Sequence, residues 1–259
     1  MGKIAIYDEA GCRIGAVEKD EAHAKGHWHR SVLLVVERDG QTLVYWRGAD
    51  QRPAECWDLL GGHADVSDRT VLATAVREAN EELVLSRGGI HLPVAAAQLQ
   101  LIGAEGCLRS DAPNNREWTT VYVLPIPLDT QVTVQDEGRS GATVERQYRF
   151  STITALRGAR KRTPSEIADG LRRFLERVDS DREFRCAVYQ GLDWQRWSIA
   201  FGCTYPDEPG CGCADSSFHA EHTFVGSFAE AEAQARSINH FEYYGDFRWW
   251  IEPIEDLQP

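Results

Sequence analysis

One segment, residues 61–85, constrains the fold more than any other part of the sequence. It begins with Gly61-Gly62 and continues into DRTVLATAVREANEELVL, where apolar residues recur at helical spacing from about residue 70 to 85. Asp68 is placed to cap this helix. At about 100° per residue, the apolar stripe and a row of glutamates fall on different faces. The segment therefore predicts a helix that buries one face and presents acid on another.

The acidic face of this helix carries Glu78, Glu81 and Glu82 within one turn. Like charges at this spacing cost roughly 0.2–0.5 kcal/mol per pair, so a counter-charge is expected. Arg77 supplies one positive charge, and Mg²⁺ prefers a few carboxylates together with phosphate oxygens. Such a run on its own is usually a solvated helix face. The glycine pair, where the backbone can approach an ion or ligand, favours a metal site instead.

Strand-like runs on both sides of the helix indicate a mixed sheet. Two short strands are expected around residues 9–11, and a hairpin is expected on Asp39-Gly40, a dipeptide that tight primed turns prefer. The further expected elements are strands at residues 99–104, 118–125 and 146–150 and a helix at 165–178. This order of strands and helices predicts an α/β fold with a mixed sheet packed between helices.

The pattern restarts beyond residue 180, where we expect a boundary between residues 1–180 and a small acidic α+β domain, residues 181–259, of unknown role. The elements expected there are strands at residues 185–189, 194–201 and 247–251 and a helix at 228–238. From residue 179 onward there are 15 acidic residues against 5 arginines, so this part holds most of the net charge of −12. An acidic surface repels phosphate backbones, and no nucleic-acid partner is expected.

No membrane partner is expected either. The longest apolar runs are strand-sized, far short of the roughly 20 residues that cross a bilayer. The N-terminal residues lack a basic stretch followed by a long apolar one, so the sequence predicts a cytoplasmic protein. The 7 cysteines are an odd number and mostly scattered, which favours reduced thiols over a disulfide scaffold.

One cluster in the C-terminal part combines three cysteines with two histidines. Zn²⁺ takes four such ligands, although the spacing is not that of a common zinc finger. A structural zinc site and a set of reduced loop thiols both stay open for this cluster, which consists of Cys203, Cys211, Cys213, His219 and His222.

Residues 62–85 resemble the Nudix box: glycine, five residues, glutamate, seven residues, Arg-Glu, an apolar residue, any residue, Glu-Glu, any residue, glycine and an apolar residue. The matching positions are Gly62, Arg77, Glu78, Ala79, Glu81, Glu82 and Leu85. There are three departures. Asp68 replaces the first glutamate, eight residues separate it from Arg77, and Val84 stands where the family has glycine.

The resemblance implies a Nudix-type fold and a hydrolase that cleaves a phosphoanhydride bond of a nucleoside diphosphate derivative or related diphosphate small molecule. In the family, the helix glutamates bind Mg²⁺ or Mn²⁺, the arginine orients them, and a glutamate outside the box often positions or deprotonates water. The resemblance thus assigns metal binding to Glu78, Glu81 and Glu82 and catalytic roles to Glu82 and Arg77. Glu117 is the candidate outside the box, with a surface position at a strand entry as the alternative.

The N-terminal half, over about residues 6–125, also resembles the isopentenyl-diphosphate isomerase branch of the family. The similarity lies in DEAG, HWHRSVLLVV and CWDLLGGH. In that isomerase, a metal is bound by a glutamate at the position of Glu117 and by histidines at the positions of His29 and His63. A cysteine at the position that Gly61 occupies here acts on the double bond of the substrate. Without that cysteine, isomerisation lacks an acid-base group, and hydrolysis is favoured.

Four residues are candidates for contact with the substrate, namely Gly61, Gly62, His29 and His63. For each histidine the alternative is a structural one, and His23 and His27 are weaker candidates. Besides hydrolysis, a rival function is that of a Nudix-fold sensor that binds its ligand without cleaving it. Isomerisation is a third possible function. The sequence leaves the substrate and a homodimeric assembly open.

Overall fold

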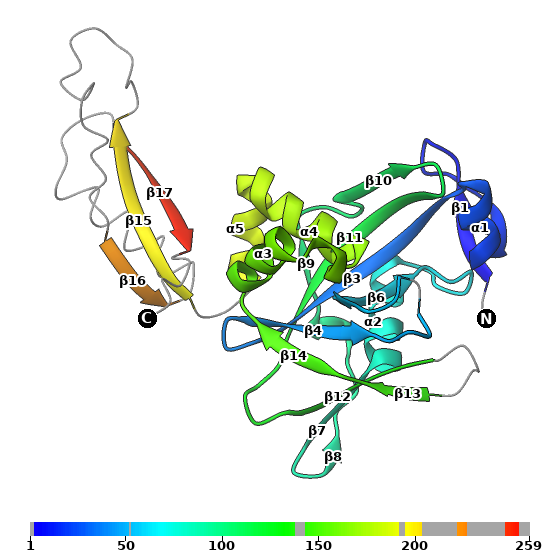
Figure 1. Ribbon diagram of the computed structural model, residues 1–259, viewed down its shortest axis with the longest axis horizontal. Helices are drawn as coiled ribbons and strands as arrows, with labels where there is room; N and C mark the ends of the chain where they lie inside the picture. The colour runs from blue at the N-terminus through cyan, green and yellow to red at the C-terminus, as the bar shows by residue number, and fades with distance from the viewer. Residues whose placement is uncertain are drawn as a thin grey trace, which may run out of the picture. The chain divides into compact units, whose positions relative to one another are not determined.

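The computed structural model describes residues 3–51, 53–137, 143–191, 195–203, 222–226 and 247–253. The chain, traced in Figure 1, divides into two units, Met1–Gly191 and Leu192–Pro259. The larger unit contains helix α5 (Arg182–Gly191), where we expected a strand over residues 185–189. That expectation was wrong: Phe184 and Val188 are both buried and lie one helical turn apart, the spacing of one helix face.

A ten-stranded mixed sheet forms the centre of the larger unit. Its strands are β1 (Lys3–Tyr7), β2 (Arg13–Glu18), β3 (Trp28–Arg38), β4 (Gln41–Arg47), β5 (Cys56–Asp58), β6 (Leu60–His63), β9 (Gln100–Ile102), β10 (Leu108–Ala112), β11 (Asn115–Pro125) and β14 (Tyr148–Ser151). The main path runs β10-β11-β3-β1-β2, with β6 paired to β3 and β9 to β11. The pairing of β3 with β11 is parallel, and it places Glu117 beside His29.

Helices cover both faces of this sheet (Figure 1). They are α1 (Lys19–Lys25), α2 (Val71–Glu82), α3 (Ile153–Arg162), α4 (Asp169–Ser180) and α5, with short 3-10 turns at Ala96–Gln98 and Pro164–Glu166. Ala75 and Ala79 of α2 pack on Val32 and Leu34 of β3. On the opposite face, Leu33 lies against α4. The expected mixed sheet between helices is confirmed.

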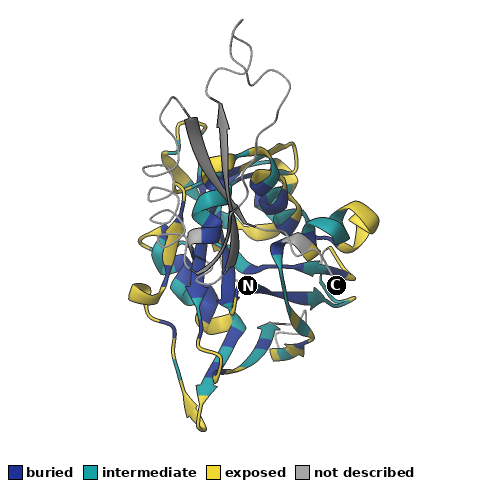
Figure 2. Cartoon of the chain, turned by 90° about the vertical axis from the view of Figure 1, so that its left-hand side faces the viewer, coloured by how far each residue is buried: buried dark blue, intermediate teal, exposed yellow. Residues whose placement is uncertain are grey.

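Local sequence explains most of these elements. β3 is buried along nearly its whole length because helices pack on both of its faces. The buried residues of the larger unit are coloured dark blue in Figure 2. The turn between β3 and β4 has positive φ at both Asp39 (55°) and Gly40 (74°), as the predicted primed turn requires. The strands expected near residues 99–104, 118–125 and 146–150 are present as β9, β11 and β14.

A second, four-stranded sheet follows the order β13-β12-β7-β8. Its strands are β7 (Leu83–Arg87), β8 (Ile90–His91), β12 (Gln131–Glu137) and β13 (Thr143–Arg146). Leu83, Leu85 and Val134 of this sheet join the core cluster that α2 forms with β3. The helix α2 is therefore held by strands of both sheets.

In the smaller unit the described residues form a three-stranded antiparallel sheet, β16-β15-β17. These strands are β15 (Gln195–Cys203), β16 (His222–Gly226) and β17 (Phe247–Pro253). The helix expected at residues 228–238 lies outside the described residues. In the described part of the chain, no helix is both long and apolar enough to span a membrane.

Candidate active site

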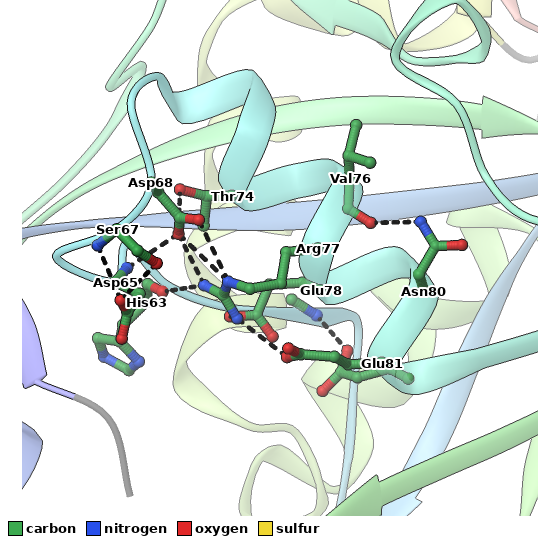
Figure 3. Close-up of polar contacts among 12 residues, drawn as sticks. His63, Asp65, Ser67, Asp68, Thr74, Val76, Arg77, Glu78, Asn80 and Glu81 are labelled. Atoms are coloured by element: carbon green, nitrogen blue, oxygen red, sulfur yellow. Dashed lines mark hydrogen bonds and ion pairs between the residues drawn. The ribbon is translucent and has the colours of Figure 1, made fainter.

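Arg77 is the centre of the polar contacts around α2 (Figure 3). Its guanidinium donates to Glu78 Oε1 at 2.8 Å and to Glu81 Oε2 at 2.9 Å. It also donates to the carbonyl oxygen of His63 at 2.8 Å and to Asp68 Oδ2 at 2.9 Å. Arg77 thus joins the acidic face of the helix to the preceding loop and to strand β6.

The Asp68 departure from the box is accommodated by this network. We expected Asp68 to cap the helix, but the structure corrects this: the N-cap is Thr70, whose Oγ1 accepts from the Ala73 amide at 3.1 Å. Asp68 instead pairs with Arg77. The shorter side chain and longer loop therefore still deliver a carboxylate to the arginine.

The Val84 departure has an equally local explanation. Helix α2 ends at Glu82, and Leu83 is extended, with φ −117° and ψ 128°. The chain passes directly into β7, where Val84 pairs with Thr133 of β12. Since no residue at this helix end adopts a left-handed conformation, glycine is not required.

Glu78 and Glu82 point inward from α2, and Glu81 lies at the rim. The side chain of Glu81 is 57% exposed, whereas that of Glu78 is 11% exposed. Glu82 Oε2 accepts the amide hydrogen of Gly61 at 2.8 Å. Burial, reinforced by the charge of Glu78, raises the pKa of Glu82 well above its ordinary value. Burial also raises the pKa of Glu78, although Arg77 opposes the rise.

A Cβ on either glycine of β6 would meet a neighbouring group too closely. A Cβ on Gly62 would overlap the carboxylate of Glu78. Gly61 has φ +144°, and a Cβ there would overlap the carbonyl oxygen of Val32. A cysteine at Gly61 does not fit this backbone, which argues against the isomerase alternative.

Gly62→Ala is expected to displace Glu78 and lower kcat/KM by about 100-fold, because small misplacements of a site residue cost that much. Gly15→Ala is the matched control, since its Cβ would meet only Ile6 at an ordinary 3.7 Å. Steady-state kinetics on both variants check the prediction. Wild-type kinetics in Gly62→Ala would show that the contact with Glu78 has no role.

A second cluster consists of His23 of α1, His29 of β3 and His63 of β6. One ligand atom from each lies within 4.8 Å of the others. His23 Nδ1 lies 3.2 Å from the carbonyl oxygen of Asn114, and His29 Nδ1 lies 2.9 Å from that of His27. A carbonyl oxygen only accepts, so both Nδ1 atoms carry a proton, and in the neutral ring the Nε2 atom then offers a lone pair.

The Nε2 atoms of this histidine cluster fit a metal ion. His23 Nε2 and His63 Nε2 are 3.3 Å apart, about the separation of two nitrogens on a tetrahedral ion with bonds of about 2.0–2.1 Å. His29 Nε2 is buried and has no hydrogen-bond partner in the part of the chain that the structure describes. Burial lowers the pKa of His29 and of His63, so both are neutral and available as ligands near pH 7.

Glu117 lies beside this cluster, with Oε1 3.9 Å from His63 Nε2. Its other oxygen accepts from Arg173 of α4 at 2.6 Å. Burial works to raise the pKa of Glu117, but the protonated form of His63, which exists at acidic pH, together with the charge of Arg173 and the Ser31 hydroxyl, outweighs burial and lowers the pKa to about 2. The carboxylate is therefore ionised.

The carboxylates of α2 and the histidine cluster lie on the two sides of β6. Gly62 pairs with Val32, whose side chain faces α2. The next residue, His63, pairs with Ser31 and lies on the opposite face of the sheet. Lys19 of α1 acts electrostatically on both groups: its charge opposes the rise in the pKa of Glu78 and adds to the fall in the pKa of His63. The exposed ammonium of Lys19 is thus a positive charge that acts on both groups.

Sequence reasoning underrated His23 and missed Lys19 and Arg173. Helix α1, not predicted, places Lys19 and His23 one turn apart on one face. That spacing was visible in the sequence. Arg173 lacked any signal, because a lone arginine in an amphipathic helix is ordinarily a surface residue.

The proposed zinc ligands lie largely outside the described residues, since Cys211, Cys213 and His219 fall there. Cys203 ends β15 and His222 begins β16. Only the backbone of these two strands is described. The zinc hypothesis stays a prediction.

A family model described as the NUDIX domain matches residues 27–174. Solved structures with a similar fold include the MutT protein from Methanosarcina mazei Go1, at 19% identity and a TM-score of 0.40, with 59% of this chain and 93% of that chain covered. The MutT NUDIX hydrolase from Burkholderia pseudomallei has 18% identity, a TM-score of 0.37 and coverage of 58% and 98%. A comparison with curated proteins finds no match.

A third similar structure is a bifunctional NMN adenylyltransferase/ADP ribose pyrophosphatase from Francisella tularensis, complexed with AMP and a Mn ion. It has 13% identity and a TM-score of 0.40, with 59% of this chain covered. The match spans 41% of that longer protein.

Proposed function

The chain belongs to the NUDIX family, and we propose that it is a divalent-metal-dependent hydrolase cleaving a phosphoanhydride bond of a diphosphate small molecule. The observation that carries this proposal is the inward pair Glu78 and Glu82, a buried and a half-buried carboxylate whose pKa values are both raised chiefly by burial. The guanidinium of Arg77 pairs with Glu78 and with Glu81. Uncompensated buried carboxylates are costly, and a bound cation relieves that cost.

Mg²⁺ and Mn²⁺ fit this donor set, because both prefer carboxylate oxygens. Glu78, Glu81 and Glu82 would hold the ion, and Arg77 fixes the first two in place. A bound divalent ion supplies charge neutralisation for the diphosphate and lowers the pKa of water. Lys19, an exposed cation whose charge acts on Glu78 and on His63, is suited to contact a phosphate.

The histidine cluster would provide a second metal position with softer ligands, and Oε1 of Glu117, which lies 3.9 Å from His63 Nε2, would complete it. Nitrogen ligands suit Zn²⁺ and Co²⁺ better than Mg²⁺ or Mn²⁺. Glu117 was expected to position or deprotonate water. With a pKa near 2 it is a weak base, so ligation or orientation of water is the better-supported role.

The test is release of phosphate or of a monophosphate product from a panel of nucleoside diphosphate derivatives and prenyl diphosphates, with Mg²⁺, with Mn²⁺ and with chelator. Metal-dependent cleavage of at least one compound is expected. Binding without cleavage across the panel would favour the sensor alternative, which rests on the same pocket residues without turnover. Double-bond migration in a prenyl diphosphate would instead support the isomerase.

A further inference from the structure

Arg173 makes a direct contact with Glu117 that neither the box nor the histidine cluster explains. Its Nη2 donates to Glu117 Oε2 at 2.6 Å, and its Nη1 donates to Thr119 Oγ1 at 3.4 Å. Both partners lie on β11, on the face that carries the histidines. The arginine side chain is 15% exposed, and that of Glu117 is 7% exposed. A charge-assisted hydrogen bond this well buried fixes the orientation of its acceptor.

The two oxygens of Glu117 therefore have different surroundings. Oε2 accepts from Arg173 and also from Asn115 Nδ2 at 3.3 Å. Oε1 is the oxygen that faces His63 Nε2, at 3.9 Å. The carboxylate thus presents one oxygen to the histidine cluster while the other is held from behind.

Helix α4 holds Arg173 on a rigid support. The Ala168 amide at its N-terminus donates to the Trp57 carbonyl at 2.9 Å, and the Leu171 amide donates to Asp58 Oδ1 at 3.3 Å. Leu171 and Phe174, on either side of Arg173, are fully buried. The guanidinium Nε also lies 3.1 Å from Asp169 Oδ2. Precise placement of site residues requires this kind of support.

We propose that Arg173 is a positioning residue that orients Glu117 so that Oε1 alone is offered to a metal ion on His23, His29 and His63. The inference rests on the proposed function through the histidine cluster. Residues behind metal ligands commonly set ligand orientation, and their loss costs about 10- to 100-fold in metal affinity or activity. A bond that merely joined α4 to β11 would affect stability and leave metal binding unchanged.

Co²⁺ is the probe, because its visible absorption reports ligand number and geometry. Titrations would compare wild type, Arg173→Lys, Arg173→Met, Glu117→Gln and the double variant Glu117→Gln/Arg173→Met, in the full chain. Arg172→Met, which alters a neighbouring arginine that is 46% exposed, is the control. The double variant removes both buried charges, so it keeps the test valid if Arg173→Met alone unfolds.

We expect Arg173→Met to weaken Co²⁺ binding about 10- to 100-fold and to change the spectrum. Arg173→Lys should retain part of the affinity that Arg173→Met loses. In a chain that already carries Glu117→Gln, Arg173→Met should cause little further loss of Co²⁺ affinity. Additive losses in the double variant, or a wild-type spectrum in folded Arg173→Met, would overturn the proposal. Absence of Co²⁺ binding by wild type would instead overturn the histidine metal position itself.

Discussion

Glu82→Gln is expected to lower kcat by about 1000-fold, because it removes a charged ligand from the site where the diphosphate charge must be neutralised. Gln has nearly the same shape, and its amide oxygen still accepts from Gly61 as Glu82 does. The substitution also removes a carboxyl group whose ionised form is disfavoured by burial and by the charge of Glu78. The thermal midpoint measured in chelator should therefore not fall.

Steady-state kinetics with Mg²⁺ and with Mn²⁺ check this result, and thermal unfolding in chelator checks the fold. Glu183→Gln is the matched control, since Glu183 lies in the first turn of α5 and is exposed. Turnover of Glu82→Gln within a few-fold of wild type would remove Glu82 from the catalytic assignment.

His63→Ala has the second large expected effect, a loss of at least about 100-fold in Co²⁺ or Zn²⁺ affinity at the histidine cluster. The expected loss is this large because His63 would be a direct ligand. Loss of a residue that only orients a ligand already lowers metal affinity by about 10- to 100-fold. His63 is the member that contacts both His23, at 3.3 Å, and Glu117, at 3.9 Å.

Calorimetric titration of Zn²⁺ or Co²⁺ into wild type and into His63→Ala measures this loss. His91→Ala serves as the control, because His91 is exposed on β8. Equal metal affinity of His63→Ala and wild type would show that the three histidines are structural. Loss of metal binding with undiminished hydrolysis would separate the histidine cluster from the reaction.

The sequence was sufficient to predict the helix α2, its buried stripe and its carboxylates, because a 3.6-residue period leaves a clear pattern over three turns. The same holds for the hairpin on Asp39-Gly40, whose turn type depends on those two residues alone. The match of residues 27–174 to the NUDIX domain confirms the family that this segment suggested.

The histidine cluster was harder to predict, because its members come from α1, β3 and β6, which are brought together by the pairing of β3 with β6 and by the packing of α1 beside them. The contact between Arg173 and Glu117 joins residues 56 positions apart. Such contacts depend on the tertiary fold, and no local pattern encodes them. The short strand predicted at residues 185–189 failed for a related reason, since a brief apolar run does not distinguish strand from helix.

The most direct test of the proposed function measures Mn²⁺ occupancy and turnover in the same samples. Electron paramagnetic resonance would follow Mn²⁺ binding to wild type and to Glu78→Gln, while product release from a cleaved diphosphate is recorded at each Mn²⁺ concentration. We predict that binding and turnover rise together in wild type and shift together to higher Mn²⁺ concentration in Glu78→Gln. Turnover that proceeds in chelator, or that keeps its wild-type Mn²⁺ dependence in Glu78→Gln, would contradict a catalytic ion held by the carboxylates of α2.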